Sequence, residues 1–472
     1  MSDALPGFTR LREIGHRFAD LAALFDAHQH PLYLVGGSVR DAFLDRGGKD
    51  YDFTTSARPE LIMQILQSYA PAVWDTGIEF GTVSAEKDEA QIEITTFRSD
   101  TYDGSSRNPE VRFGDSLEGD LVRRDFKVNA MAVRITPEGD VELHDPMEGL
   151  SDLQAGLLDT PATPEQSFHD DPLRMLRAAR FVSQLECAVA PRVRQAMEEM
   201  SGEITRITAE RVQMEMSKLM LGRAPWTGID VMVETGLADH VLPEVPALRL
   251  TQDEHKQHKD VYVHSKRVLR NATEHEGEDG PDLVLRWAAL MHDIGKPATR
   301  EFHEGGAVSF HQHEVVGAKM VRQRLRALKY PKQVVKDVSQ LVFLHMRFYG
   351  YSDAPWSDSG VRRYANDAGE LLPRLNKLVR SDCTTRNKRK SQRLKRAYDE
   401  LEQRIADLAE KENLAAVRPD LNGNDIMEIL ELPPGPEVGR AWSYLKELRL
   451  DQGPMEREDA IAALRSWWQE QN

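Results

Sequence analysis

The chain has only two cysteines, Cys187 and Cys383, in 472 residues. Two cysteines cannot form the disulfide framework of a small secreted domain, and their scarcity is typical of the reducing cytoplasm. Long apolar runs are also missing, since no stretch approaches the ~20 residues that span a bilayer. The first six residues have neither a basic nor an apolar region, so they predict no secretory signal. We therefore expect a cytoplasmic protein with no membrane partner.

Basic residues are in the minority, with 61 Lys and Arg against 77 Asp and Glu and a formal net charge of −16. This excess of negative charge argues against a general nucleic-acid coat, and no DNA partner is expected. A local basic stripe can still bind RNA phosphates. The 40% hydrophobic and 29% charged residues are typical of a globular protein, and the length allows roughly three domains.

Strand and helix patterns alternate in the first third of the chain, and helical patterns dominate the rest. Apolar spacing predicts a helix over 9–28, and further helices are expected after Val39, after Pro59 and over 117–122. The predicted strands are 32–36, 51–54, 72–75, 80–86, 91–97, 131–135 and 141–144. From about Gln166 the strand patterns stop. The expected fold class is therefore α+β, a small mixed α/β head followed by an all-helical remainder.

Two carboxylates, Asp50 and Asp52, are separated by one residue in a predicted strand. Residues i and i+2 of a strand point to the same face, so both side chains can hold one hard cation such as Mg²⁺. Glu93, in an alternating strand, is a candidate third carboxylate that fixes the metal or takes a proton. The alternatives are a solvated loop for the aspartate pair and the solvent side of a half-buried strand for Glu93.

A predicted strand ends at the glycine pair Gly36-Gly37, ahead of these carboxylates. Glycines let backbone N–H groups approach a phosphate closely. Arg40 and Arg124 carry guanidinium groups that suit triphosphate oxygens. For Arg40 the alternative is a surface salt bridge with a following aspartate, and for Arg124 it is an exposed charged turn. Phosphate binding beside a carboxylate pair is the minimum equipment of metal-assisted nucleotidyl transfer.

Four segments together resemble the class II tRNA nucleotidyltransferases, the superfamily of CCA-adding enzymes and bacterial poly(A) polymerases. They are Leu-Val-Gly-Gly-Ser-Val-Arg-Asp at 34–41, Lys-Asp-Tyr-Asp-Phe at 49–53, Arg-Arg-Asp-Phe-Lys-Val-Asn-Ala at 123–130 and Asp-Asp-Pro-Leu-Arg-Met-Leu-Arg-Ala-Ala-Arg-Phe at 170–181. The resemblance covers roughly residues 30–220. It implies template-independent addition of C, C and A to the tRNA 3′ end.

The same resemblance implies CTP, ATP and tRNA as partners and two Mg²⁺ ions as cofactors in the head. Asp50, Asp52 and Glu93 would be the catalytic carboxylates, with Gly36-Gly37 and Arg124 among the triphosphate contacts. A poly(A) polymerase of the same superfamily is the alternative function. A non-catalytic nucleotide or RNA sensor is a third, from another class.

The fourth segment is predicted to select the base. Asp171 and Arg174 are three residues apart, so they are expected on one helical face. Aspartate accepts hydrogen bonds and arginine donates them, so the two can read the Watson–Crick edge of cytosine or adenine. Arg177 and Arg180 follow at the same step and are assigned to nucleotide binding. The alternative is an ordinary salt bridge. The later segment Glu210-Arg211-Val212, with Glu215, is expected to brace this neck region rather than touch substrate.

A second constellation holds six candidate metal ligands: His264, His292, Asp293, His313, His345 and Asp382. Their order resembles the HD phosphohydrolase superfamily over about 260–385. Imidazole with carboxylate suits a divalent transition metal. The resemblance implies phosphoester hydrolysis, with Lys296 placed to neutralise a phosphate oxygen. For each histidine alone the alternative is a surface or core residue, and His311 competes with His313 for one position.

The strongest basic run in this acidic chain is predicted to contact RNA phosphates through Arg386, Lys388, Arg389, Lys390 and Arg393. A solvated helix balanced by the acidic residues that follow is the alternative. The expected domains are a nucleotidyltransferase head at 1–160, a helical neck at 161–245, an HD domain at 246–385 and a helical RNA-contacting region at 386–472.

Overall fold

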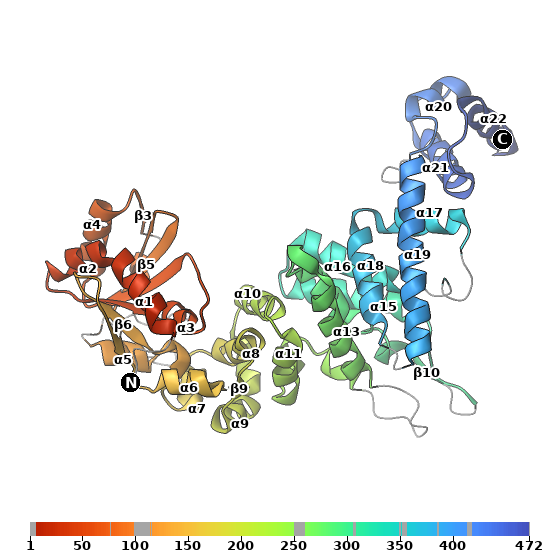
Figure 1. Cartoon of the computed structure of the whole chain (residues 1–472). Helices are drawn as coiled ribbons and strands as arrows, with labels where there is room; N and C mark the ends of the chain where they lie inside the picture. The colour runs from red at the N-terminus through yellow and green to blue at the C-terminus, as the bar shows by residue number, and fades with distance from the viewer. Residues whose placement is uncertain are drawn as a thin grey trace. The chain divides into compact units, whose positions relative to one another are not determined.

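The computed structural model describes residues 6–75, 77–98, 114, 116–249, 260–304, 308–348, 351, 356–384, 387–412 and 418–471. The chain divides into two compact units, Met1–Val241 and Leu242–Asn472 (Figure 1). The first contains a sheet and helices, and the second is almost entirely helical, so the predicted α+β class is confirmed. The four-part domain division stays a prediction. Among the described residues, no helix combines the length and apolar character needed to span a membrane.

The head is built on one seven-stranded sheet with the order β3-β4-β5-β2-β1-β6-β7. Its strands are β1 Leu32–Val35, β2 Asp50–Thr55, β3 Ala72–Trp74, β4 Thr82–Lys87, β5 Ala90–Thr96, β6 Ala132–Ile135 and β7 Val141–His144. The helices are α1 Pro6–Arg17, α2 Ala19–Asp26, α3 Gly37–Phe43, α4 Pro59–Tyr69, α5 Leu117–Val122 and α6 Gly149–Ala155. All seven predicted strands are present, with ends that differ by up to two residues.

Strand β2 alternates between core and solvent. Tyr51 and Phe53 are buried, and both rings pack edge-on against Phe18, with centroids 4.8 and 5.1 Å apart. Asp50 and Asp52 are exposed on the other face. Burial of the two rings therefore fixes the direction of the two carboxylates, because a one-residue slip would reverse every side chain. Phe18 also interrupts the single helix predicted over 9–28, which is α1 and α2 in the structure.

Helices follow the head within the first unit. They are α7 Pro164–Asp170, α8 Leu173–Leu185, α9 Pro191–Met200, α10 Ala209–Met220, α11 Pro225–Glu234 and α12 Leu237–Val241. The prediction that strands stop near Gln166 is wrong in detail, because β9 Ala188–Val189 pairs in parallel with β8 Leu157–Leu158, and β10 Arg300–Phe302 pairs with β11 Val308–Phe310 in the second unit. A two-residue strand carries no periodicity that a sequence pattern can reveal.

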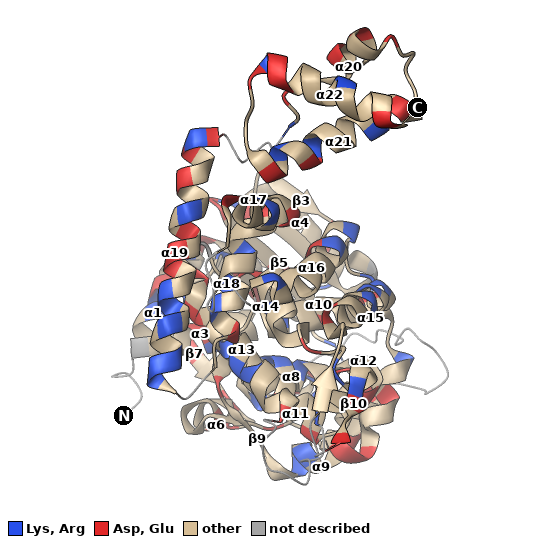
Figure 2. Cartoon of the chain, turned by 90° about the vertical axis from the view of Figure 1, so that its right-hand side faces the viewer, with Lys and Arg blue, Asp and Glu red and all other residues tan. Residues whose placement is uncertain are grey.

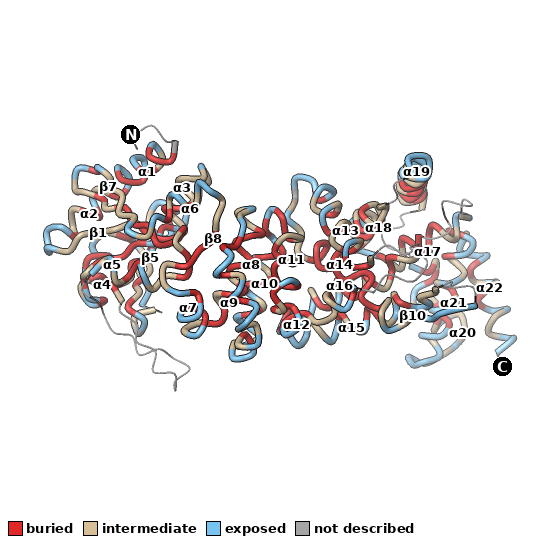
Figure 3. Tube along the Cα trace, turned by 90° about the horizontal axis from the view of Figure 1, so that it is seen from below, coloured by how far each residue is buried: buried red, intermediate tan, exposed pale blue. Residues whose placement is uncertain are grey.

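The second unit packs helices around α14. Its elements are α13 Val261–His275, α14 Leu283–Met291, hairpin strands β10 Arg300–Phe302 and β11 Val308–Phe310, α15 His313–Ala327, α16 Lys332–Leu344, α17 Asp358–Ala368, α18 Leu372–Asp382, α19 Lys388–Glu412, α20 Gly423–Leu430, α21 Pro436–Gln452 and α22 Arg457–Gln471. Seen as a burial-coloured trace, α14 is almost wholly buried (Figure 3). A helix that is apolar all round forms the centre of a bundle.

Candidate functional site

The aspartate pair on β2 lies beside the glycine turn that follows β1. Ser38 connects the two, since its Oγ donates to the carbonyl oxygen of Asp50 at 3.3 Å and accepts from the backbone N–H of Asp52 at 3.1 Å. Gly37, Ser38 and both aspartates line a pocket of about 190 Å³. Sequence reasoning missed Ser38, although its place directly after the glycine pair was a usable signal.

Gly36 lets an arginine and a carboxylate face each other across the turn. Its φ of +68° is in the left-handed region, which favours glycine. A Cβ atom at this position would lie 3.1 Å from Nη1 of Arg124 and 3.9 Å from Oδ2 of Asp52. A second carboxylate fixes the position of Arg124, because its Nη2 donates to the buried Asp120 carboxylate at 3.1 Å. The turn, Arg124 and Asp52 therefore surround one small space.

Three carboxylates lie on one face of the sheet, on the neighbouring interior strands β2 and β5. Strands β2 and β5 run parallel, and Asp52 is the register partner of Glu93. Desolvation raises the pKa of the Asp52 carboxyl group, and repulsion from Glu93 and Asp50 adds to it, whereas Arg124 opposes it. Glu93 is exposed, as its solvent-side alternative predicts, but on the face that Asp52 shares. A divalent cation would relieve this repulsion, so the donor set fits Mg²⁺.

Arg40 is occupied by protein partners. Its Nε and Nη2 donate to the two carboxylate oxygens of Asp41 at 2.9 and 3.0 Å, and its Nη1 donates to Oδ1 of Asn129 at 2.7 Å. Arg40 therefore forms the salt bridge that was the alternative to phosphate binding, although it is buried rather than at the surface. In this arrangement Arg40 joins the glycine turn to the segment around Asn129.

Two arginines of α8, Arg177 and Arg180, form an ionic network with buried carboxylates. Arg177 donates through Nε and Nη2 to Oδ2 of Asp125 at 2.8 and 2.5 Å, and Arg180 pairs with Glu215 at 3.1 Å. Burial alone would raise the pKa of the Asp125 carboxyl group, but Arg177 and a hydrogen bond from Asn129 hold it well below its usual range. This network ties α8 to the head.

The predicted placement of Asp171 on one helical face with Arg174 is wrong. Helix α7 ends at Asp170, and Asp171 is extended, with φ −142° and ψ 99°, because a residue before proline is disfavoured from helical geometry. Its Oδ1 accepts from the backbone N–H of Leu173 at 3.1 Å, and its Oδ2 accepts from Arg211 at 2.8 Å. Asp171 therefore caps the start of α8, and Arg211 braces it as expected.

Arg174 is the second residue of α8, and its guanidinium has two hydrogen-bond partners. Its Nη1 donates to Oγ of Ser167 at 2.9 Å, and its Nη2 donates to the carbonyl oxygen of Arg123 at 2.8 Å. The guanidinium plane is therefore fixed relative to the head segment that also carries Arg124.

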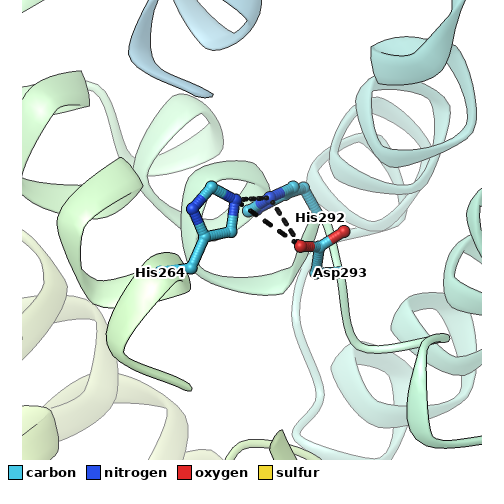
Figure 4. Close-up of side chains that lie close together, drawn as sticks. All are labelled: His264, His292 and Asp293. Carbon is cyan, nitrogen blue, oxygen red and sulfur yellow. Dashed lines mark hydrogen bonds and ion pairs between the residues drawn. The ribbon is translucent and has the colours of Figure 1, made fainter. Parts of the chain in front are cut away.

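The six predicted metal ligands come together in the second unit, five of them at or next to helix ends. Nε2 of His264 lies 3.3 Å from Nε2 of His292 and 3.6 Å from Oδ2 of Asp293 (Figure 4). Asp382 joins this group, with its Oδ1 2.9 Å from Nε2 of His264. The structure brings His313 into the cluster and leaves its competitor, His311, exposed.

Asp293 also belongs to a second ligand group. Its Oδ1 lies 3.3 Å from Nε2 of His313 and 4.0 Å from Nε2 of His345, whereas Oδ2 faces the first group. One carboxylate therefore lies between two sets of imidazoles. Lys296 donates to the same Oδ2 at 2.7 Å.

Each cluster histidine is oriented by a partner on its other ring nitrogen. Nδ1 of His292, His313 and His345 lies 2.9, 3.0 and 2.6 Å from a backbone carbonyl oxygen, and Nδ1 of His264 lies 3.1 Å from Oγ1 of Thr384. Such partners present Nε2 to a metal. Burial lowers the pKa of His345 to about 4, so its imidazole is neutral at pH 7, as a ligand must be.

The predicted RNA-contacting residues start helix α19. Lys388, Arg389, Lys390 and Arg393 are all exposed on its first turns, and Arg386 lies outside the described residues. The basic start of α19 gives way to mixed charges along the helix (Figure 2).

Paired carboxylates beside a glycine turn on a mixed sheet define the class of metal-dependent nucleotidyltransferases. Family models agree: "Poly A polymerase head domain" matches 32–159, "Probable RNA and SrmB- binding site of polymerase A" matches 188–248 and "HD domain" matches 261–413. The chain is 34% identical to the A-adding tRNA nucleotidyltransferase of Deinococcus radiodurans, over 93% of this chain and 95% of that one. It is 28% identical to the CCA-adding enzyme of Enterococcus faecalis, over 96% of each.

The fold also matches solved structures. The Bacillus stearothermophilus CCA-adding enzyme in complex with CTP superposes with a TM-score of 0.70 at 25% identity, over 99% of this chain and 98% of that one. The Thermotoga maritima CCA-adding enzyme complexed with tRNA has the same fold, with a TM-score of 0.60 at 18% identity over 98% of each chain. The chain therefore belongs to the tRNA nucleotidyltransferase family of the CCA-adding enzymes, and it carries an HD domain.

Proposed function

We propose that the protein adds C, C and A to the 3′ end of tRNA from CTP and ATP. The observation that carries the proposal is the carboxylate cluster of Asp50, Asp52 and Glu93 beside the glycine turn. Asp50 and Asp52 would hold Mg²⁺, which activates the attacking 3′-hydroxyl and neutralises the triphosphate. Ser38 fixes the backbone of both aspartates, and Arg124 supplies positive charge at the turn. tRNA as substrate agrees with the cytoplasmic location expected from the sequence.

Three tRNA acceptors test this function, one lacking all three terminal nucleotides, one ending in the first C and one ending in both. We expect CTP to extend the first two and ATP to extend only the third. One relative is an A-adding enzyme, so the test depends on which nucleotides the protein adds to each acceptor. If ATP extended the third acceptor while CTP extended neither of the others, the protein would be an A-adding enzyme and the proposal would be wrong.

We also propose that Asp171 and Arg174 read the incoming base, although Asp171 does so from the start of α8 rather than from within it. Replacing either by alanine should reduce discrimination between CTP and ATP by roughly tenfold, because a hydrogen bond to a charged group contributes about 1.5–3 kcal/mol. The KM for tRNA should change little. The control is the misincorporation rate of Arg194→Ala, which removes a partly exposed arginine paired with Glu234. Unchanged selectivity in Asp171→Ala and Arg174→Ala would refute this role.

The HD cluster supports a second activity, hydrolysis of phosphoesters at RNA ends. Asp293 belongs to two ligand groups, and each group also contains two imidazoles. The donor set therefore fits two adjacent divalent transition-metal ions. Two such ions, held by the two ligand groups, would supply an activated water and charge stabilisation for the leaving oxygen. Removing a terminal or 2′,3′-cyclic phosphate would leave the free 3′-hydroxyl that nucleotide addition needs.

The exposed cations at the start of α19 are proposed to contact RNA phosphates. Their exposure in an otherwise acidic chain supports this role. Because phosphate binding releases counterions, the KM for tRNA in the acceptor assay should rise steeply with salt. A KM that is insensitive to salt would refute it.

A further inference from the structure

The β10–β11 hairpin carries a set of side chains that none of the roles above uses. The strands pair antiparallel, with Arg300 opposite Phe310 and Phe302 opposite Val308. Opposite residues share a face of the ladder, as do residues two apart on one strand. These four side chains therefore lie on one face of the hairpin (β10 in Figure 1), which we call the aromatic face.

The aromatic face begins at the metal cluster. Lys296, whose Nζ donates to Asp293, lies 5.6 Å from the centroid of the Phe310 ring. The carbonyl oxygen of Phe310 lies 3.0 Å from Nδ1 of His313. The inner end of the hairpin is thus joined to both ligand groups, because Asp293 belongs to both and His313 to one.

The outer end of the aromatic face is open to solvent. Phe302 is 69% exposed, the largest value among the exposed large hydrophobic residues that the structure describes. The Arg300 guanidinium lies 4.5 Å from the centroid of its ring. Nε of Arg300 is buried without a hydrogen-bond partner, and within the described ranges no carboxylate forms an ion pair with this arginine. A cation and a ring are therefore held together, and no acidic side chain in the described part of the chain forms an ion pair with the cation.

Two cations and two rings lead from the metal cluster toward solvent. Lys296 comes first, Phe310 and Arg300 follow opposite each other, and Phe302 comes last. Proteins that hold single-stranded RNA use this combination, because every base can stack on an aromatic ring and every phosphate attracts a cation. A strand advances about 3.4 Å per residue, so the backbone of Phe302 lies about 7 Å beyond that of Arg300, while the Arg300 guanidinium and the Phe302 ring lie 4.5 Å apart.

We propose that the aromatic face binds the single-stranded 3′ end of an RNA. A base stacks on Phe302, and the phosphates lie along Arg300 and Lys296, so that the terminal phosphate reaches the metal cluster. The inference rests on the proposed hydrolysis and defines its substrate class, which is the end of an RNA strand rather than a free nucleotide or a small phosphoester.

The test uses the full-length protein and a single-stranded RNA trinucleotide whose middle base is 2-aminopurine and whose 3′ end is a non-hydrolysable methylenephosphonate. Stacking quenches 2-aminopurine, so a fluorescence titration reports binding without hydrolysis. Phe302→Leu, which keeps an apolar side chain but removes the ring, should weaken binding roughly tenfold and abolish the quench. Phe302→Trp should retain both.

Glu301→Gln is the matched control, because Glu301 pairs with Ser309 on the opposite face of the same hairpin. Equal affinity of the wild type and Phe302→Leu would overturn the proposal. A change in sedimentation of Phe302→Leu with unchanged RNA affinity would also overturn it and make the face a protein contact. Binding that depends on Phe302, together with no hydrolysis of 3′-phosphorylated RNA under any divalent metal, would uphold this site and refute the proposed hydrolysis alone.

Discussion

Asp52→Asn should reduce nucleotide incorporation by about a thousandfold or more while the protein stays folded. Asp52 stands between Asp50 and Glu93, and asparagine cannot supply the negative charge that holds Mg²⁺. Loss of metal assistance removes several kcal/mol of transition-state stabilisation, and each 1.36 kcal/mol is about tenfold in rate. Incorporation of labelled CTP into tRNA that lacks its terminal nucleotides measures the effect.

The stability of this variant gives an independent check. The pKa of Asp52 is raised in the fold, so its charged form is less favourable there than in the unfolded chain, and folding is penalised above the raised pKa. At neutral pH Asp52→Asn should therefore have a melting temperature equal to or above that of the wild type. Mg²⁺ should raise the melting temperature of the wild type but not of the variant.

Asp26→Asn is the matched control, since it removes an exposed carboxylate at the end of α2 in the same unit. It should keep both incorporation and the response to Mg²⁺. Full incorporation by Asp52→Asn would remove the catalytic assignment, and a large drop in its melting temperature would show that Asp52 stabilises the fold.

The carboxylate pair was predictable because a strand has a period of two. Tyr51 and Phe53 had to face the core, and their neighbours therefore had to face solvent together. The aspartate partner of Arg40 was one of the predicted alternatives, but its second partner was not predictable, because Asn129 is 89 residues away and reaches Arg40 only through the packing of the sheet. The place of Asp171 was predictable in principle, since the proline that follows it marks the start of a new helix.

In the second unit the order of histidines and aspartates predicted which residues lie together. It did not predict that they form two ligand groups that share Asp293. That Asp293 lies between two ligand groups depends on how α15 packs against α16 and α16 against α14. The aromatic face was not predicted, because strands of three residues have no period to detect and only the pairing of the two strands brings Phe310 opposite Arg300.

Asp293→Asn should abolish phosphoester hydrolysis and leave nucleotide addition unchanged. The carboxylate contributes one oxygen to each ligand group, so its loss removes a ligand from both. We expect the metal content of the purified variant to fall from up to two ions to near zero, measured by mass spectrometry of the elements. Hydrolysis of an RNA with a 2′,3′-cyclic phosphate should fall by about a thousandfold or more.

A second variant separates loss of the metal from loss of the fold. His264→Gln removes a ligand from the first group only, at a side chain that is 15% exposed, so about one ion should remain in the second group. Asp399→Asn, which removes an exposed carboxylate paired with Arg380 in the same unit, should keep both ions. Both cluster variants should still add nucleotides to tRNA, because their ligands lie in the unit that does not contain Asp50 and Asp52. Hydrolysis that survives in Asp293→Asn would show that the cluster is not its catalytic centre.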